Sequence, residues 1–388
     1  MQLSNGKISS QPIRVLHVLS DEHRAYQLNN LCDYTDRKEI VFSFVTFAKR
    51  ASFVTDLEAR GVRVEALDAM DHSKYPYAIK EIWKMIEQER VDIVHTHLFE
   101  PTLIGLLLAK LRGRKMILTR HHSDAMYHIP SSIKRRICLG LEKSISTFSD
   151  HIIAPSQMVR DILVKKEGTR PDKVTLIPYP QTTERFEQIT PEAIRKVKEE
   201  LGMDGSHLVL VCNSRIYHRK GHIYLFRALA PLIKAGLQAS LYLVGTGPDS
   251  YRLELEGITK ELEIHQHVRF LGWRYDALAI MAAADIIVHP SFEDALSSAL
   301  IESVMLSRPI IATDISGARD TLDNGRLGLL VPPADAEAFR MALEKMLSNL
   351  DEYRENVRRG RQHIINYMGA AKVARDYITC YQRVLRNA

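Results

Sequence analysis

The sequence predicts an α/β fold with two doubly wound, Rossmann-like parallel-sheet domains that face a cleft. Short apolar runs alternate with helix-length amphipathic segments along the whole chain. A proline-containing stretch interrupts this alternation near the middle, and a length of 388 residues exceeds what one core usually holds. Because ligands of open parallel sheets bind beyond the carboxyl ends of the strands, we expect the site in the cleft.

The expected strands form two sets, one in each half of the chain. The first set covers residues 13–19, 40–47, 62–67, 92–97, 115–120, 151–154 and 174–177. The second set covers residues 208–212, 240–244, 268–271, 286–289, 310–313 and 329–331. Prolines and polar residues fill positions 178–191 between the sets. We therefore predict one domain over residues 1–185 and a second over residues 186–369.

The composition is that of a folded globular protein, with 45% hydrophobic and 26% charged residues. The four cysteines are scattered without C-x-x-C spacing, which indicates reduced thiols in a cytoplasmic protein. The amino end has no apolar run that could serve as a signal peptide. The longest apolar run, residues 103–109, is too short to cross a bilayer. We expect a cytoplasmic location.

The basic charge of the chain, +6 with a pI near 9.0, is compatible with several partners. Nucleic acid is not expected, because the basic residues are not gathered in a DNA-reading motif. Nucleotide substrates and anionic phospholipid surfaces both suit this charge. In residues 130–145, apolar side chains repeat every four residues beside the basic cluster 134–136. This pattern favours an ordinary surface helix with a solvated face; a peripheral contact with the inner face of the membrane is the alternative.

Three strand ends in the second half carry motifs that suit a phosphorylated ligand. Residues 290–302 join an apolar strand to a helix whose free N–H groups would point at the loop. Arg215 and Lys220 follow another strand, five positions apart, where two cations could hold a diphosphate. Gly245 and Gly247 end a third strand, where missing side chains would let a ligand approach the backbone.

Together these motifs resemble the retaining glycosyltransferases of GT-B fold in family four, a group of sugar-nucleotide-dependent bacterial enzymes. The matching positions are Arg215, Lys220, Gly221 and residues 245–248, 270–272, 290–291, 294–302, 317–320 and 325–331. The resemblance implies transfer of a hexose-type sugar from a nucleoside-diphosphate sugar to an acceptor hydroxyl, with retention and without a metal or other cofactor. It implies a glycan, lipid-linked or small-molecule acceptor, a role in cell-surface polysaccharide or glycolipid assembly, and a final helix, 370–388, that crosses back to an acceptor-side first domain.

The resemblance also implies roles for residues of the second half. Arg215 and Lys220 would stabilise charge on the departing diphosphate. Asp294 stands where the family usually has Glu and would bind sugar hydroxyls, with Glu293 as a second candidate and a helix N-cap as the structural alternative. Glu302 would accept hydrogen bonds from the ribose. The backbone amides that would face the phosphate or sugar belong to Ala295, Leu296 and Ser297.

In the first half, Thr119-Arg120-His121 stands where the family has Thr-x-His near the sugar. The resemblance implies that His121 donates a hydrogen bond near the anomeric centre, with His122 as a second candidate. His97 could contact donor or acceptor. His95 and His97 share a strand face and raise the question of zinc, but without cysteine or carboxylate at ligand spacing we expect no metal. Residues 20–25 replace the family's Gly-Gly loop, which points to a different acceptor or loop geometry.

Two alternatives stay open. A sugar-nucleotide 2-epimerase on the same fold would return a sugar nucleotide, whereas a transferase liberates the diphosphate. A non-catalytic nucleotide- or glycan-binding protein would bind UDP or GDP and release none from any sugar nucleotide. A dehydrogenase is disfavoured, because no Gly-x-Gly-x-x-Gly follows the first strand.

Overall fold

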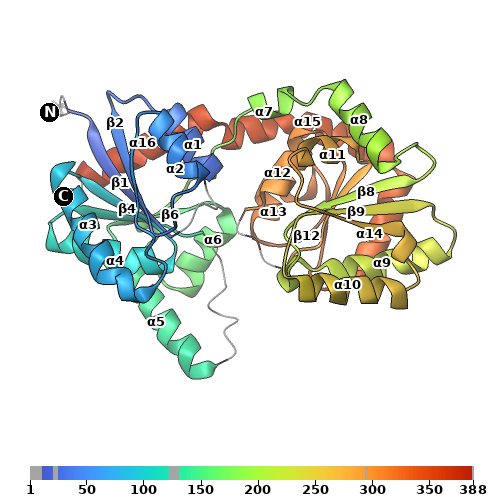
Figure 1. Ribbon diagram of the computed structural model, residues 1–388, viewed down its shortest axis with the longest axis horizontal. Coiled ribbons are helices and arrows are strands. Elements are labelled where there is room, and N and C mark those ends of the chain that lie inside the picture. Colours follow the sequence, from blue (N-terminus) through green and yellow to red (C-terminus); the bar gives the residue numbers. More distant parts are fainter. Residues whose placement is uncertain (1–10, 21–24, 122–130, 293, 295, 387–388) are drawn as a thin grey trace, which may run out of the picture. The chain divides into compact units, whose positions relative to one another are not determined.

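The computed structural model describes residues 11–20, 25–121, 131–292, 294 and 296–386. The chain divides into two compact units, Met1–Gln181 with Met368–Ala388, and Thr182–Tyr367. Each unit holds one parallel sheet with helices packed on both faces (Figure 1). The prediction of two Rossmann-like parallel sheets is confirmed.

The sheet of the first unit has seven strands in the order β3-β2-β1-β4-β5-β6-β7. Its strand order reverses between β1 and β4, so the loops at this switch point are the natural place for a ligand. The strands are β1 Ile13–Leu19, β2 Ile40–Thr46, β3 Arg63–Ala66, β4 Ile93–His97, β5 Lys115–Thr119, β6 His151–Ala154 and β7 Val174–Leu176. The main helices are α1 Ala25–Asp33, α2 Ser52–Ala59, α3 Tyr75–Gln88, α4 Phe99–Leu111, α5 Ser132–Phe148 and α6 Gln157–Asp161.

The last helix, α16 (Ala370–Arg386), belongs to the core of the first unit. Its buried face, which includes Val373, Tyr377 and Tyr381, packs in one apolar cluster with Phe44 of β2 and Phe53 of α2. Burying this face ties the end of the chain to the first unit through the hydrophobic effect. The unit boundary falls at residues 181/182, four positions before the predicted one.

The sheet of the second unit has six strands in the order β10-β9-β8-β11-β12-β13, with its switch point between β8 and β11. The strands are β8 Leu208–Asn213, β9 Ala239–Val244, β10 Val268–Gly272, β11 Ile286–His289, β12 Ile310–Thr313 and β13 Leu329–Val331. The main helices are α7 Glu184–Glu187, α8 Pro191–Leu201, α9 His222–Lys234, α10 Asp249–Glu261, α11 Ala277–Ala283, α12 Ser298–Met305, α13 Ser316–Thr321, α14 Ala336–Ser348 and α15 Leu350–Met368. Among the described residues, none of these or the other helices combines the length and apolarity that crossing a bilayer requires.

Candidate functional site

The switch point of the second unit brings Lys220 and Asp294 together. Lys220 closes the turn after β8, and Asp294 lies in the loop after β11. The Nζ atom of Lys220 lies 2.6 Å from Oδ2 of Asp294, and their side chains are 10% and 26% exposed. Nε2 of His289 lies 3.5 Å from the same oxygen. Burial alone would raise the pKa of Asp294, but His289 and Lys220 hold it well below its usual range.

A glycine makes this meeting of two loops sterically possible. Gly221 has φ of 68°, and a Cβ atom there would lie 2.0 Å from the carbonyl oxygen of Pro290. The backbone N–H of Phe292 donates to the carbonyl of Arg219 at 2.8 Å, which joins the same two loops. Only glycine combines the left-handed conformation with this contact, so the sequence Lys220-Gly221 places the ammonium group beside the β11 loop.

Gly245 and Gly247 pack against protein backbone rather than leaving space for a ligand. A Cβ atom on Gly245 would lie 2.1 Å from the carbonyl oxygen of Ser214, and one on Gly247 would lie 1.8 Å from that of Ile216. These glycines thereby hold the loop that carries Arg215. The Arg215 side chain is exposed, with its guanidinium 5.5 Å from the ring centroid of Tyr217. The geometry thus explains both glycines without a ligand.

Glu302, on α12, is buried together with two polar partners. Its side chain accepts hydrogen bonds from Nη1 of Arg185 at 3.1 Å and from Nδ2 of Asn213 at 3.3 Å. Burial raises the pKa of Glu302, and Arg185 opposes that shift. Burial of a carboxylate requires such partners, and sequence reasoning singled out neither Arg185 nor Asn213.

The start of α12 completes the part of the candidate site that lies in the second unit. Leu296 and Ser297 are buried, and Ser297 is the N-cap residue of α12. The N-cap role considered for Asp294 therefore belongs to Ser297. Glu293 and Ala295 lie outside the described residues.

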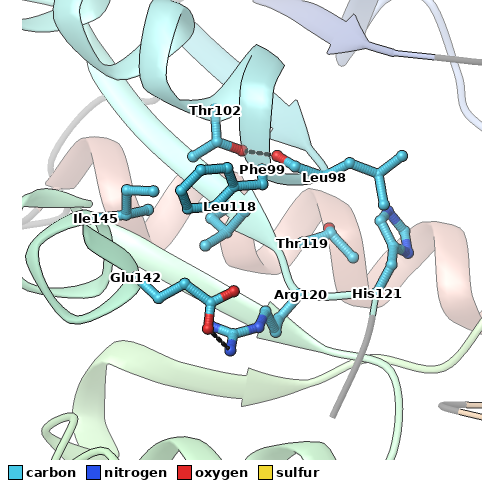
Figure 2. Close-up of a pocket in the computed structure, with 9 residues that line it drawn as sticks. All are labelled: Leu98, Phe99, Thr102, Leu118, Thr119, Arg120, His121, Glu142 and Ile145. Carbon is cyan, nitrogen blue, oxygen red and sulfur yellow. Dashed lines mark hydrogen bonds and ion pairs between the residues drawn. The ribbon is translucent and has the colours of Figure 1, made fainter. Parts of the chain in front are cut away.

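In the first unit, a pocket opens where β4 and β5 end. Its cavity volume is about 20 Å³, and it has apolar and polar walls from α4, β5 and α5 (Figure 2). The residues that line it are Leu98, Phe99, Thr102, Leu118, Thr119, Arg120, His121, Glu142 and Ile145. A small cavity with convergent polar groups is the usual form of a binding site for part of a small molecule.

Charged groups cluster in one wall of this pocket. Nη2 of Arg120 lies 2.6 Å from a carboxylate oxygen of Glu142 and 2.9 Å from one of Glu167, and all three side chains are buried. Figure 2 shows the side chains of Arg120 and Glu142 pointing toward each other. Burial raises the pKa of Glu142 to about 7, although Arg120 acts in the opposite direction. Near neutral pH this carboxyl can therefore hold or release a proton.

The backbone is strained at the rim of the same pocket. Leu98, which follows β4, has φ of 67° and ψ of 173°, a region that is essentially restricted to glycine. Such a conformation costs on the order of 1–3 kcal/mol in a residue with a Cβ atom. Strain of this kind clusters at functional sites, which supports a binding role for the pocket.

His121 is buried, and both of its ring nitrogens have partners. Nε2 of His121 lies 2.7 Å from Nδ1 of His97, and Nδ1 of His121 lies 2.9 Å from the hydroxyl oxygen of Tyr179. Nε2 of His97 in turn lies 2.9 Å from Nδ1 of His17. Sequence reasoning singled out His121 and His97 but missed Tyr179 and His17. His122 lies outside the described residues.

Three buried histidines, His17, His95 and His97, also have ring nitrogens within 4.8 Å of one another. The nitrogens of His95 already contact the hydroxyl groups of Tyr381 at 2.8 Å and Thr119 at 2.7 Å. The rings of His95 and His97 stack at 4.6 Å with planes 20° apart. Both ring nitrogens of His95 are thus engaged in hydrogen bonds.

The architecture of the two units is that of GT-B glycosyltransferases. Anabaena Alr3699/HepE, solved in complex with UDP-glucose, has a TM-score of 0.80 and 19% identity, over 96% of this chain and 99% of that one. A glycosyltransferase from Rickettsia africae has a TM-score of 0.80 and 23% identity, over 97% of this chain and 100% of that one. The predicted GT-B fold is confirmed.

Two family models match the sequence, one in each half. A model for Glycosyltransferase Family 4 matches residues 27–185, and one for Glycosyl transferases group 1 matches residues 207–349. The chain therefore belongs to the family-four glycosyltransferases. A relative from Escherichia coli, UDP-Gal:alpha-D-GlcNAc-diphosphoundecaprenol alpha-1,3-galactosyltransferase, is 22% identical over 369 residues, which are 89% of this chain and 89% of the relative.

Proposed function

We propose that the chain is a retaining hexosyltransferase, which moves a sugar from a nucleoside-diphosphate sugar to an acceptor hydroxyl. The observation that carries this proposal is the contact between Lys220 and Asp294 at the switch point of the second sheet. A cation for phosphate and a carboxylate for sugar hydroxyls stand side by side there. The UDP-glucose complex of the Anabaena neighbour and the UDP-Gal donor in the name of the Escherichia coli relative support a nucleotide-sugar donor.

The transition state gains negative charge on the departing diphosphate while the sugar gains positive character. Lys220 and Arg215 stabilise that charge, and a single oriented donor of this kind typically contributes about 3 kcal/mol. Arg215 is exposed at the loop after β8, where a diphosphate can reach it. These cations supply the charge that a metal would otherwise provide, so we propose that transfer needs no metal. Front-face displacement, with the leaving phosphate taking the acceptor proton, gives retention.

Asp294 and Glu302 bind the two remaining parts of the donor, the transferred sugar and the ribose. Asp294 binds hydroxyls of the sugar, since its carboxylate stands beside the lysine that holds the diphosphate. Glu302 accepts from the ribose; its carboxylate has about four acceptor sites, so the bonds from Arg185 and Asn213 leave capacity. The backbone N–H groups at the start of α12 face the phosphate or the sugar.

On the acceptor side, we propose that the pocket beside His121 holds part of the acceptor. Its lining combines apolar side chains with Arg120, His121 and Glu142, which suits one portion of a glycan or lipid-linked molecule rather than the whole. The acceptor named for the Escherichia coli relative is a sugar on a lipid diphosphate. A lipid-linked acceptor, and a role in cell-surface polysaccharide or glycolipid assembly, agree with an apolar pocket wall next to charged groups.

Two exposed apolar stripes lie near this pocket. On α4 the exposed side chains repeat at i, i+4 and i+8, and so do those on α5, which extends from the body of the first unit (Figure 1). They are Leu103, Leu107, Leu111, Ile133, Ile137 and Leu141. Ile145, the next position of the predicted repeat, is buried instead. With the basic residues 134–136 beside them, these stripes fit an anionic membrane, and we propose a cytoplasmic protein at its inner face.

The transferase proposal is tested by incubating the protein with a panel of UDP- and GDP-sugars and candidate acceptors. Release of nucleoside diphosphate together with a glycosylated product supports it, and NMR of the anomeric proton reports retention. Return of an altered sugar nucleotide would show the epimerase. Tight binding without release from any donor would show the binding protein.

The membrane proposal is tested separately by flotation with phosphatidylglycerol and phosphatidylcholine vesicles. We expect the protein to float only with the anionic vesicles, and Ile133→Glu with Ile137→Glu to abolish flotation. Met341→Glu is the matched control, because Met341 is 58% exposed, as Ile137 is, but lies on α14 in the second unit. Equal flotation of the double variant and the control would show that the α5 surface does not bind the membrane.

A further inference from the structure

A line of hydrogen-bonding groups runs from Tyr179 into the core of the first unit. Tyr179, His121, His97 and His17 follow one another at 2.9, 2.7 and 2.9 Å between the contacting atoms. His17 is fully buried, stacked 4.9 Å from the ring of Phe44. Its Nε2 has no hydrogen-bond partner among the described residues, so the line ends there.

Each contact in this line needs one hydrogen, which couples the tautomers of the three histidines. A neutral imidazole carries a single N–H, so its second nitrogen must accept. Burial lowers the pKa of His17 well below its usual value, with His97 acting in the same direction, which keeps His17 neutral. Once one end of the line donates, every other group in it must follow the same direction.

The tyrosine end sets that direction. A phenol O–H is a stronger acid than a neutral imidazole N–H, and an imidazole nitrogen is a stronger base than a phenol oxygen. Tyr179 therefore donates to Nδ1 of His121. Nε2–H of His121 then donates to Nδ1 of His97, and Nε2–H of His97 donates to Nδ1 of His17. All three histidines are left with their hydrogen on Nε2.

We propose that Tyr179 sets the tautomer of His121 and that His97 and His17 are positioning residues that accept along the line, so that His121 carries its hydrogen on Nε2 and a lone pair on Nδ1. On the proposed transferase function, on which this inference rests, a substrate hydroxyl takes the place of the Tyr179 hydroxyl at Nδ1. His121 then accepts a hydrogen bond from the substrate, whereas the family resemblance implied that it donates one. In the absence of substrate, the Tyr179 hydroxyl donates to Nδ1 of His121.

The tautomer of His121 can be measured directly by ¹⁵N NMR of histidine-labelled protein, with the resonances assigned by their loss in His121→Gln. We expect a pyrrole-type Nε2 and a pyridine-type Nδ1. Two other histidines act as internal references: Nδ1 of His267 lies 2.7 Å from the carbonyl oxygen of Ala239, and Nε2 of His363 lies 3.2 Å from that of Asp320. Because carbonyls only accept, these two must show opposite tautomers. A His121 spectrum that matches His267 would overturn the proposal.

Two substitutions at His97 separate positioning from packing. In His97→Asn the side-chain oxygen can stand where Nδ1 stood and accept from His121, whereas His97→Phe fills the space without accepting. Because Tyr179 still donates to Nδ1 in both variants, we expect His121 to keep its tautomer in both, whereas only the Asn variant accepts the hydrogen on Nε2. Turnover with a sugar nucleotide should fall about tenfold further in the Phe variant, mainly in kcat. Equal kcat in both variants would contradict the positioning role.

The NMR experiment uses protein without substrate, so it stands apart from the transferase test. If no donor is turned over but His121 shows the expected tautomer, the proposed function fails and the hydrogen-bonded line remains. If turnover is found but the tautomer is reversed, the function stands and this inference falls. Tyr179→Phe removes the donor that sets the direction of the line, so His121 should show a mixture of tautomers in that variant; a single, unchanged tautomer would count against the argument.

Discussion

Replacement of Lys220 by methionine should destabilise the second unit in a pH-dependent way. The substitution removes the ammonium group that lies 2.6 Å from Asp294 and keeps most of the side-chain volume. Both side chains are mostly buried, so solvent screens the contact only in part. A hydrogen bond between charged groups contributes about 1.5–3 kcal/mol. We expect the free energy of unfolding to fall by about 2 kcal/mol at pH 7, which lowers Tm by roughly 4–8 °C for a unit of this size.

The pH dependence follows from the lowered pKa of Asp294. A carboxyl whose pKa is lower in the folded state stabilises the fold above its unfolded pKa of about 4 and loses this contribution as the pH falls through the folded value. The difference in Tm between the wild type and Lys220→Met should therefore be constant from pH 5 to 8 and shrink below about pH 4. Calorimetric scans across this range measure it.

A double-mutant cycle with Asp294→Asn isolates the pair. The coupling energy between the two positions should be about 1–2 kcal/mol at pH 7, because each single variant removes the same contact. If Lys220→Met unfolds at the wild-type temperature at pH 7, or if the loss persists unchanged at pH 3, the ion pair does not stabilise the unit as argued.

Three further predictions test other parts of the account by thermal unfolding. The stability of Glu142→Gln relative to the wild type should be about 2 kcal/mol more favourable at pH 8 than at pH 5. The reason is that a Glu142 pKa raised to about 7 makes the wild type lose stability as the pH rises from about 4 to 7. A stability difference that does not change with pH would refute this. Arg185→Met should cost about 2–3 kcal/mol, more at pH 8 than at pH 5, since it leaves the buried Glu302 carboxylate without its cation; Glu302→Gln in the same chain should recover most of the loss. Gly221→Ala should cost about 1–3 kcal/mol more than Gly202→Ala, since both have φ near 68–69° but only Gly221 would meet backbone; equal losses would show that the loops can separate.

The sequence was sufficient to predict the sheets, whereas the meeting of Lys220 with the Asp294 loop follows once the strand order is known. Each strand is a short apolar run, and parallel strands place their carboxyl ends at one edge of the sheet. Lys220 follows β8 and Asp294 follows β11, which are neighbours at the switch point. Residues that follow adjacent strands in this way are brought together by topology alone.

Other contacts could not be predicted, because they depend on side-chain packing between distant segments. Arg185 lies in the polar linker, 117 positions before its partner Glu302, and no periodicity marks it. His17 reads as one more residue of a buried strand, and its contact with His97 crosses between strands 80 positions apart.

The glycines show a different limit. Gly245 and Gly247 were correctly placed at a strand end, but sequence alone could not tell close approach of a ligand from close approach of backbone. The carbonyls of Ser214 and Ile216 occupy that space. A glycine in the sequence indicates that another group approaches the main chain closely, and the structure is needed to identify that group.

The central claim is that Lys220 holds the diphosphate of a nucleotide-sugar donor. Isothermal titration of UDP and GDP into the wild type, Lys220→Met and Lys234→Met tests it most directly. Lys234 is a matched control, because it lies in the same unit, is 56% exposed and pairs with Glu263. We predict that one diphosphate binds the wild type and Lys234→Met equally and binds Lys220→Met about 100-fold more weakly, in line with a loss near 3 kcal/mol. Equal affinity of all three proteins for that nucleotide would contradict the account.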